Sequence, residues 1–335
     1  MSDLERDPAE TLGSGDCDGP ALEVLEGREV VLGRTTTVRR LLPNKDRRMV
    51  GAWCFVDHYG PEDLSSRVDS YGVPGERGML VPPHPHTSLQ TVSWLFEGEI
   101  EHRDSVGSHA MVRPGELNIM TAGDGIAHSE VSTPTAPPRL HGAQLWVALP
   151  DSVRTTTPPT FNAYADLPRV EFDGARGTVM MGTVAGATSP APAYTPLVGA
   201  DLTIDAGGTL DLPLEPAYEY AVLVVDGELS VGELTPGFGE MVYIGARREE
   251  IRLVASRNGV RFLLLGGEPF EEQLVMWWNF IGRSHDDIVA ARNAWQDAIS
   301  AGGNERFRMV PGYDGDPLPA PPLPATTLKP RPRSR

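Results

Sequence analysis

Two short stretches of the sequence contain histidines and a carboxylate at a spacing that suits metal binding. His84-Pro-His86 and His128-Ser-Glu130 each place two potential metal ligands two residues apart. In an extended strand, residues two apart point to the same face. If the two strands lie side by side inside a barrel, three imidazoles and one carboxylate converge, and such a set is typical of a transition-metal site.

The segment between these two pairs has the composition of short strands joined by turns. Thr91–Phe96 is rich in β-branched and aromatic residues, and turn signals follow at Gly98, Pro114-Gly115 and Gly123-Asp124-Gly125. Short strands at this density are typical of a β-barrel or sandwich, so an all-β fold is expected.

Several motifs in order resemble the two-part motif of the cupin superfamily and, more closely, the pirin family. The resemblance covers roughly residues 30–300, and motifs in order are far more specific than any one alone. The motifs that carry it are Val38-Arg-Arg-Leu-Leu-Pro43, Asp57-His-Tyr-Gly-Pro61, Gly78 through His84-Pro-His86, Glu97-Gly-Glu-Ile-Glu-His-Arg-Asp104, Arg113-Pro-Gly115, Met120-Thr-Ala-Gly123, His128-Ser-Glu130 and Leu145-Trp-Val-Ala-Leu-Pro150.

The resemblance implies two cupin (jelly-roll-like) β-barrels in tandem, with one iron in the N-terminal barrel. Matched position by position, the ligands it implies are His84, His86, His128 and Glu130. The family usually has Arg-Gly-Phe-Glu where this chain has Thr87-Ser88-Leu89-Gln90. Gln90 brings no negative charge, so Glu130 is the one anionic ligand identified, and Gln90→Glu is expected to tighten metal binding.

The second half of the chain repeats the first. Tyr220–Val231 parallels Val92–Ile100, and aligning Gly227 on Gly98 puts Pro213 and Glu215 where His84 and His86 stand. No histidine lies between His141 and His285, so the second barrel is expected to hold no equivalent metal.

After the second barrel, the spacing of apolar residues changes from that of a strand to that of a helix. Ser284 is a good N-cap, a helical stripe follows, and Gly302-Gly303 stops it. The stripe consists of Ile288, Ala291, Trp295 and Ile299. The expected domains are a disordered tail 1–20, a metal-binding cupin barrel 21–150, a linker 151–160, a metal-free cupin barrel 161–283, a helix 284–303 and a solvated Pro-rich basic tail 304–335.

Composition narrows the classes of partner. The formal charge of −17 argues against direct nucleic-acid binding, since phosphate contacts need basic patches. The acidic N-terminus has no apolar signal core and no apolar run is long enough to span a membrane, so a cytoplasmic location is expected. Cys17, in the tail, and Cys54, a small core residue, give no disulfide framework.

The other histidines have plainer interpretations. His102 and His109 are expected on the surface of a hairpin. His58 is either close to the metal ligands or a buried hydrogen-bonded residue, and His141 lacks a partner at ligand spacing. His285 is expected to lie at the start of a helix. Residues 59–78 are expected to form a loop over the barrel mouth.

Three neutral imidazoles and one carboxylate suit Fe(II), and Ni, Cu, Mn, Co or Zn also fit. The resemblance implies quercetin 2,3-dioxygenase-type activity on a chelating flavonol-like or other enediol-type substrate, with Glu130 as the catalytic base. The alternative is a non-catalytic, metal-dependent regulatory protein that acts through contacts with a protein partner. The expected partners are therefore a small-molecule substrate or a regulatory protein, with neither nucleic acid nor membrane.

Overall fold

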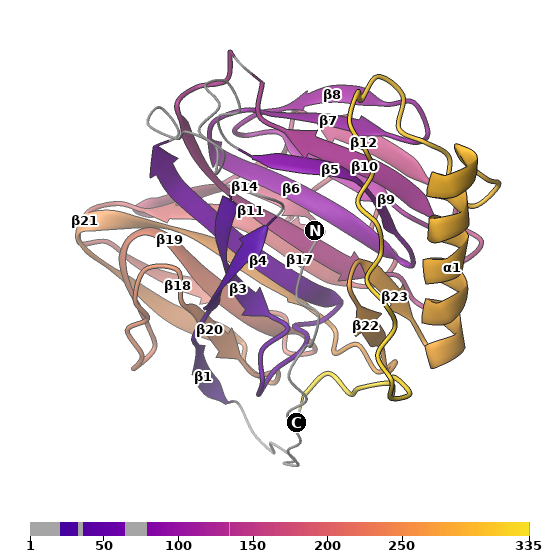
Figure 1. The fold of residues 1–335 in the computed structure, drawn as a ribbon. Coiled ribbons are helices and arrows are strands. Elements are labelled where there is room, and N and C mark those ends of the chain that lie inside the picture. Colours follow the sequence, from indigo (N-terminus) through magenta and orange to yellow (C-terminus); the bar gives the residue numbers. More distant parts are fainter. Residues whose placement is uncertain (1–20, 33–35, 64–78, 134, 335) are drawn as a thin grey trace.

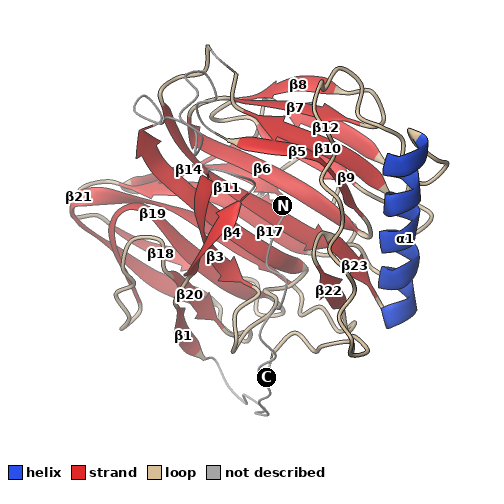
Figure 2. Ribbon diagram, viewed as in Figure 1, coloured by secondary structure: helices blue, strands red, loops and turns tan. Residues whose placement is uncertain are grey.

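A computed structural model describes residues 21–32, 36–63, 79–133 and 135–334. The predictions for the N-terminal tail with Cys17, and for most of the expected loop over the barrel mouth, lie outside these ranges. Within them β-strand is the main secondary structure, and one helix lies near the C-terminus (Figure 2). The expected all-β architecture of two barrels and a C-terminal helix is confirmed, and none of the described helices is long and apolar enough to cross a bilayer.

The first barrel consists of a seven-stranded and a four-stranded antiparallel sheet that face each other (Figure 1). The seven-stranded sheet contains β2 (Arg28–Leu32), β3 (Thr36–Leu42), β4 (Trp53–Asp63), β6 (Leu89–Glu97), β9 (Leu117–Thr121), β11 (Arg139–Ala148) and β12 (Thr160–Tyr164). The four-stranded sheet contains β5 (Leu80–His86), β7 (Ile100–Asp104), β8 (His109–Val112) and β10 (Ile126–Val131).

The second barrel is built from one eight-stranded sheet and two short hairpins accompany it. The sheet contains β1 (Leu22–Leu25), β13 (Arg169–Phe172), β14 (Ala175–Met181), β17 (Leu197–Ile204), β18 (Thr209–Pro213), β19 (Glu219–Val231), β20 (Met241–Ile244) and β21 (Glu250–Gly267). The hairpins are β15 (Thr183–Val184) with β16 (Ala187–Thr188), and β22 (Val275–Trp277) with β23 (Phe280–Gly282), which leads into α1 (His285–Ala301).

One apolar cluster contains residues of both barrels, and a separate cluster fills the interior of the second barrel. Along β19, Val222 and Val224 fill the interior of the second barrel, whereas Leu223 and Val225 belong to the core cluster of the first barrel. A strand buried on both faces reads as an unbroken apolar run rather than an alternating one, and this explains the sequence of β19. Trp53 crosses the same boundary, because its indole Nε1 donates to the carbonyl of Val198 at 3.0 Å.

Two strands belong to a different barrel from the one expected from the sequence. β1 pairs with β20 of the second barrel rather than joining the first, and β12 pairs with β9 of the first barrel rather than beginning the second. Each strand covers an edge of the neighbouring sheet, where unpaired backbone groups would otherwise need another partner.

The start of the expected mouth loop is also strand rather than loop. Tyr59–Asp63 continues β4, paired with β11 through Gly142 and Arg139. A register shift between Leu140 and Gly142 accommodates Pro61, which cannot donate to the ladder.

The C-terminal segment packs on the body of the protein, so the prediction of a solvated tail is wrong. Phe307 is buried against α1, and the Trp295 indole donates to the carbonyl of Leu318 at 2.8 Å. Leu318 in turn donates its backbone N–H to Pro83 in β5. Near the end of the chain, Arg333 pairs with the buried carboxylate of Glu219. The segment is basic, but apolar contacts, hydrogen bonds and an ion pair hold it against the rest of the protein.

α1 begins and ends where the sequence predicts. The Ser284 side chain accepts the backbone N–H of Asp287, and Gly302 ends the helix with a left-handed conformation (φ 76°). Its buried stripe consists of Ile288, Ala291, Trp295 and Ala298.

Candidate metal centre

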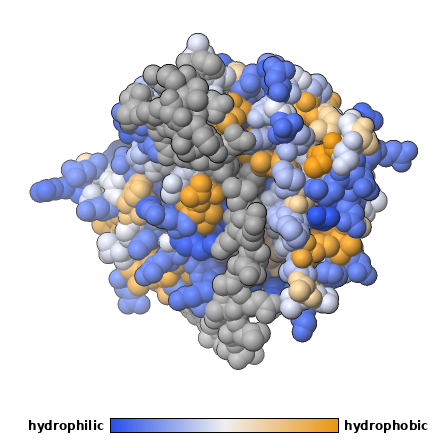
Figure 3. All heavy atoms as spheres, viewed as in Figure 1, coloured by the Kyte–Doolittle hydropathy of each residue, from blue (hydrophilic) through white to orange (hydrophobic). Residues whose placement is uncertain are grey.

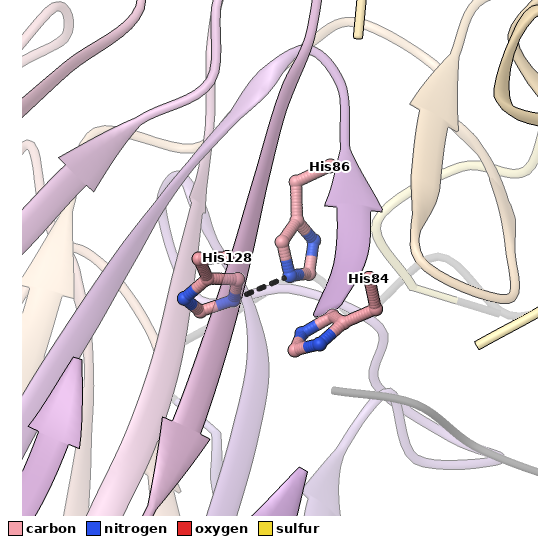
Figure 4. A group of neighbouring side chains, drawn as sticks. All are labelled: His84, His86 and His128. Carbon is pink, nitrogen blue, oxygen red and sulfur yellow. Dashed lines mark hydrogen bonds between the residues drawn. The ribbon is translucent and has the colours of Figure 1, made fainter. Parts of the chain in front are cut away.

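Three buried imidazoles meet on the inner face of the four-stranded sheet (Figure 4). His84 and His86 come from β5, and His128 comes from β10, where it lies directly opposite His84. One ring nitrogen from each lies within 4.8 Å of the others, and the Nε2 atoms of His86 and His128 are 3.1 Å apart. The period-two spacing of His84 and His86 and the pairing of β5 with β10 together bring the rings to one point.

The Nδ1 atoms of two of these histidines are engaged by backbone carbonyls. His84 Nδ1 lies 2.9 Å from the carbonyl oxygen of Pro82, and His86 Nδ1 lies 3.2 Å from that of Asn279. A carbonyl only accepts, so each Nδ1 carries the proton and each Nε2 keeps a free lone pair. The Nε2 atom of His84 is buried and has no hydrogen-bond partner within the described ranges.

This arrangement fits a divalent metal ion. Two nitrogens at about 2.1 Å from an ion and at a right angle would be about 3.0 Å apart, close to the distance between His86 and His128. Burial lowers the pKa of His84, His86 and His128 well below the ordinary value of histidine, so all three rings are neutral at pH 7. Neutral imidazoles with free lone pairs are what metal binding requires.

Glu130 lies on the same strand face as His128 but is not part of the converging group. Its carboxylate Oε1 is 3.4 Å from Ser93 Oγ of the facing sheet. The pairing of β10 with β5 shifts register between His128 and Glu130, and Glu130 is not in the group of ligand atoms that all lie within 4.8 Å of one another. Burial raises the pKa of Glu130 above its ordinary value, although the Ser93 contact acts in the opposite direction. The role of Glu130 as a ligand therefore stays a prediction.

Aromatic side chains of the seven-stranded sheet face the imidazoles. Trp146 stacks on Phe55 with ring centroids 4.1 Å apart and meets His86 edge-on at 5.0 Å. Tyr59 shares this face because it is four residues from Phe55 on β4. The Tyr59 hydroxyl and the Trp146 indole N–H are buried, and neither has a hydrogen-bond partner in the described part of the chain.

Gln90 does not face the metal centre. It is three residues from Ser93 on β6, so it points to the opposite face of the sheet. There its Nε2 donates to Thr121 Oγ1 at 3.0 Å and contacts the carbonyl of Pro192 at 3.4 Å. Gln90→Glu is thus not expected to place a charge beside the imidazoles, and these contacts do not support the reason for expecting tighter metal binding.

Two further histidines, His58 and His141, form a separate buried pair. Their Nε2 atoms are 2.8 Å apart on the face of the seven-stranded sheet that packs on the second barrel, where His58 also contacts Phe238. Burial lowers the pKa of His58 to about 3 and that of His141 to about 4. Of the two alternatives for His58, the buried hydrogen-bonded residue is the one observed.

The expected surface position of His102 is wrong. The residue is buried beside His128, with the two Nδ1 atoms 3.4 Å apart, and not on the surface. The signal was present: His102 and Asp104 are two apart on a strand, as His84 and His86 are. His109 is an exposed residue paired with Glu101, and His285 stands at the helix start, both as expected.

Cys54 is a buried residue of the core, and burial raises the pKa of its thiol to about 12. It therefore remains a neutral thiol at physiological pH and offers no thiolate ligand.

Known proteins resemble this chain over most of its length. Family models described as Pirin and as Pirin C-terminal cupin domain match residues 35–147 and 199–300. A Pseudomonas aeruginosa protein named "Putative quercetin 2,3-dioxygenase" is 42% identical over 303 residues, which is 90% of this chain and 91% of that protein. A crystal structure of quercetin 2,3-dioxygenase from Acinetobacter baumannii is 40% identical, with a TM-score of 0.84, over 92% of this chain and 97% of that one.

A bacterial pirin from Escherichia coli, solved in complex with nickel(II), shares the fold at 17% identity and a TM-score of 0.54, over 75% of this chain and 100% of that one.

Proposed function

Because this chain belongs to the pirin family of the cupin superfamily, we propose that its first barrel binds Fe(II) and oxidises a chelating, flavonol-like substrate. The observation that carries the proposal is the convergence of three neutral, buried imidazoles with their Nε2 lone pairs directed to one point. The relatives named as quercetin 2,3-dioxygenases support the substrate class.

In this proposal His84, His86 and His128 hold the metal, and Glu130 serves as fourth ligand and as base. When bound, the metal supplies a Lewis acid for the chelating oxygens of the substrate and a redox partner for dioxygen. Cu, Mn, Co and Zn also suit imidazole ligands. Nickel(II) is the ion in the related pirin structure.

Glu130 is suited to accept the hydroxyl proton of the substrate. A carboxylate whose pKa is raised by burial is a stronger base than an exposed one, and here it lies on the same face as His128. Ser93 Oγ, 3.4 Å away, holds the carboxylate toward the interior.

The facing aromatic residues are suited to bind the substrate. The stacked rings of Phe55 and Trp146 offer an apolar wall beside His86. The unpaired Tyr59 hydroxyl and Trp146 N–H can donate to the substrate's oxygens, and a buried donor without a partner is costly unless something polar occupies the space.

The alternative, a regulatory protein that turns nothing over, has less support. On the face drawn in Figure 3, apolar residues lie in separate patches among polar ones. The exposed large apolar side chains of the described ranges are Val24, Val31, Val106, Phe238 and Val254. Most of residues 59–78, which were expected to form a loop over the barrel mouth, lie outside the described residues.

The test is anaerobic reconstitution with Fe(II), followed by quercetin and air while the flavonol absorbance is recorded. The proposal predicts loss of absorbance for the wild-type protein and for His109→Ala, which alters an exposed residue. His128→Ala should bind no stoichiometric metal and leave the absorbance unchanged. A fully metallated wild-type protein that does not consume quercetin would remove this substrate and favour the regulatory alternative.

A further inference from the structure

A line of side chains leads from the metal centre to the far end of β7. His128 Nδ1 lies 3.4 Å from His102 Nδ1, and His102 Nε2 lies 3.2 Å from Asp104 Oδ2. All three side chains are buried, and β7 pairs with β10 so that Asp104 stands opposite His128. The contacts are therefore set by the register of two adjacent strands.

The direction of the hydrogen bonds follows from the end of this line. Asp104 Oδ1 accepts the backbone N–H groups of Val106 at 3.0 Å and Ser108 at 2.9 Å, which fixes the carboxylate as an acceptor. Its Oδ2 then accepts from His102 Nε2. When His128 binds the metal of the proposed function through Nε2, its Nδ1 carries the proton and donates to His102 Nδ1, which leaves the N–H that His102 donates to Asp104 on Nε2. His128 Nε2 is left with its lone pair facing His86.

The ring of His102 is held in place from the other side. It stacks on Phe161 with centroids 4.1 Å apart and an interplanar angle of 17°. Phe161 belongs to β12, the strand that crosses to the first barrel and pairs with β9. Rotation of the His102 ring would lose this stacking and both of its hydrogen bonds.

We propose that His102 and Asp104 are positioning residues that fix the Nδ1–H tautomer of His128 and so present its Nε2 to the metal. His84 and His86 obtain the same tautomer from backbone carbonyls, which no side-chain replacement removes, whereas His128 depends on two side chains. Carboxylate and histidine partners of this kind orient a ligating imidazole and raise its basicity. The inference rests on the metal site of the proposed function but not on its substrate.

Asp104→Asn is the informative change. The amide oxygen can still accept from Val106 and Ser108, but its NH₂ group would face His102 Nε2 and make that nitrogen an acceptor. The proton of His102 would move to Nδ1, and His128 would then carry its proton on Nε2, toward the metal. We expect Co(II) affinity to fall by about 10- to 100-fold, the range for loss of such partners. His102→Phe, which keeps an aromatic ring against Phe161, should cause a loss in the same range.

Two measurements test this in the full-length protein. Titration with Co(II) gives the dissociation constant, and ¹⁵N spectra of histidine-labelled, metal-free protein report which nitrogen of each imidazole is protonated. The expected result is Nδ1–H for His128 in the wild type and Nε2–H in Asp104→Asn. Glu101→Gln is the matched control, since Glu101 is a carboxylate on the same strand bonded to the exposed His109 at 2.8 Å. It should change neither measurement.

The inference is overturned if Asp104→Asn keeps Nδ1–H on His128, or binds Co(II) within twofold of the wild type. A fall in affinity equal to that of Glu101→Gln would also overturn it, because it would show a general effect of charge. A wild-type protein that binds no Co(II) would refute the proposed metal site, and the ¹⁵N spectra would still decide whether Asp104 sets the tautomer. Failure to consume quercetin affects neither measurement.

Discussion

Replacing His58 should make the stability of the protein less sensitive to acid. His58 is 2% exposed, and burial, followed by the nearby His141 and Arg39, lowers its pKa from 6.5 to about 3. An unfolded chain takes up a proton at this residue below pH 6.5, whereas the folded chain does not. Stability due to the neutral ring is therefore complete above pH 6.5 and is lost as the pH falls toward the pKa of the folded state.

The size of this loss follows from the two pKa values. At pH 5, protonation of an unfolded histidine with an ordinary pKa favours unfolding by about 2 kcal/mol, while the folded state gains almost nothing. His58→Gln keeps a hydrogen-bonding group near His141 but cannot take up a proton. Between pH 8 and pH 5, the variant should thus lose about 2 kcal/mol less of its unfolding free energy than the wild type.

The assay is urea unfolding of chelator-treated protein at each pH, with His109→Gln as the control at an exposed histidine. The quantity compared is the change in unfolding free energy from pH 8 to pH 5, so a constant loss from the altered packing of His58→Gln cancels. Parallel curves for His58→Gln and the wild type would refute the reasoning, because they would show that His58 is protonated equally in both states.

Three other changes test the packing around the centre. Gln90→Glu should leave Co(II) affinity within twofold but lower the unfolding free energy by about 3 kcal/mol, since the new charge would be buried beside the Pro192 carbonyl. Tighter Co(II) binding would contradict the placement of Gln90 on the face of β6 that points away from the metal centre. Trp295→Ala should cost about 3–5 kcal/mol in urea unfolding and expose the C-terminal segment to limited proteolysis, because it removes a fully buried side chain; an unchanged cleavage pattern would count against that docking. Gly142→Ala would bring a Cβ to 2.6 Å from the Tyr59 hydroxyl, and calorimetry should show a loss of about 1–3 kcal/mol; a neutral result would show that Tyr59 moves freely.

Much of the centre could be predicted because its cues are local. His84 and His86 share a face through the two-residue period of a strand, and this holds wherever the strand lies. The same is true of α1, whose cap at Ser284 and stop at Gly302 act over a few residues. The family motifs then supplied the pairing of β5 with β10, which spacing alone leaves open.

Strand parity could not predict which way Gln90 points, because parity does not continue through a turn. Between His86 and Leu89 the chain passes from the four-stranded to the seven-stranded sheet, and Ser88 adopts a left-handed conformation there (φ 61°). A count from His86 therefore does not reveal which side of β6 faces the metal. Contacts from distant strands decide it, namely Ser93 with Glu130 on one face and Gln90 with Pro192 on the other.

The sequence by itself determined the two barrels, the terminal helix and the three histidines that converge, because each of these follows from short-range periodicity or from an ordered set of motifs. Only the tertiary structure decided that His102 is buried behind His128, that Glu130 contacts Ser93 of the facing sheet, and that the basic C-terminal segment is docked. Those outcomes depend on which surfaces meet across sheets. Burial and hydrogen bonding between residues far apart in the chain carry that information, which a local spacing such as that of His102 and Asp104 can suggest but does not decide.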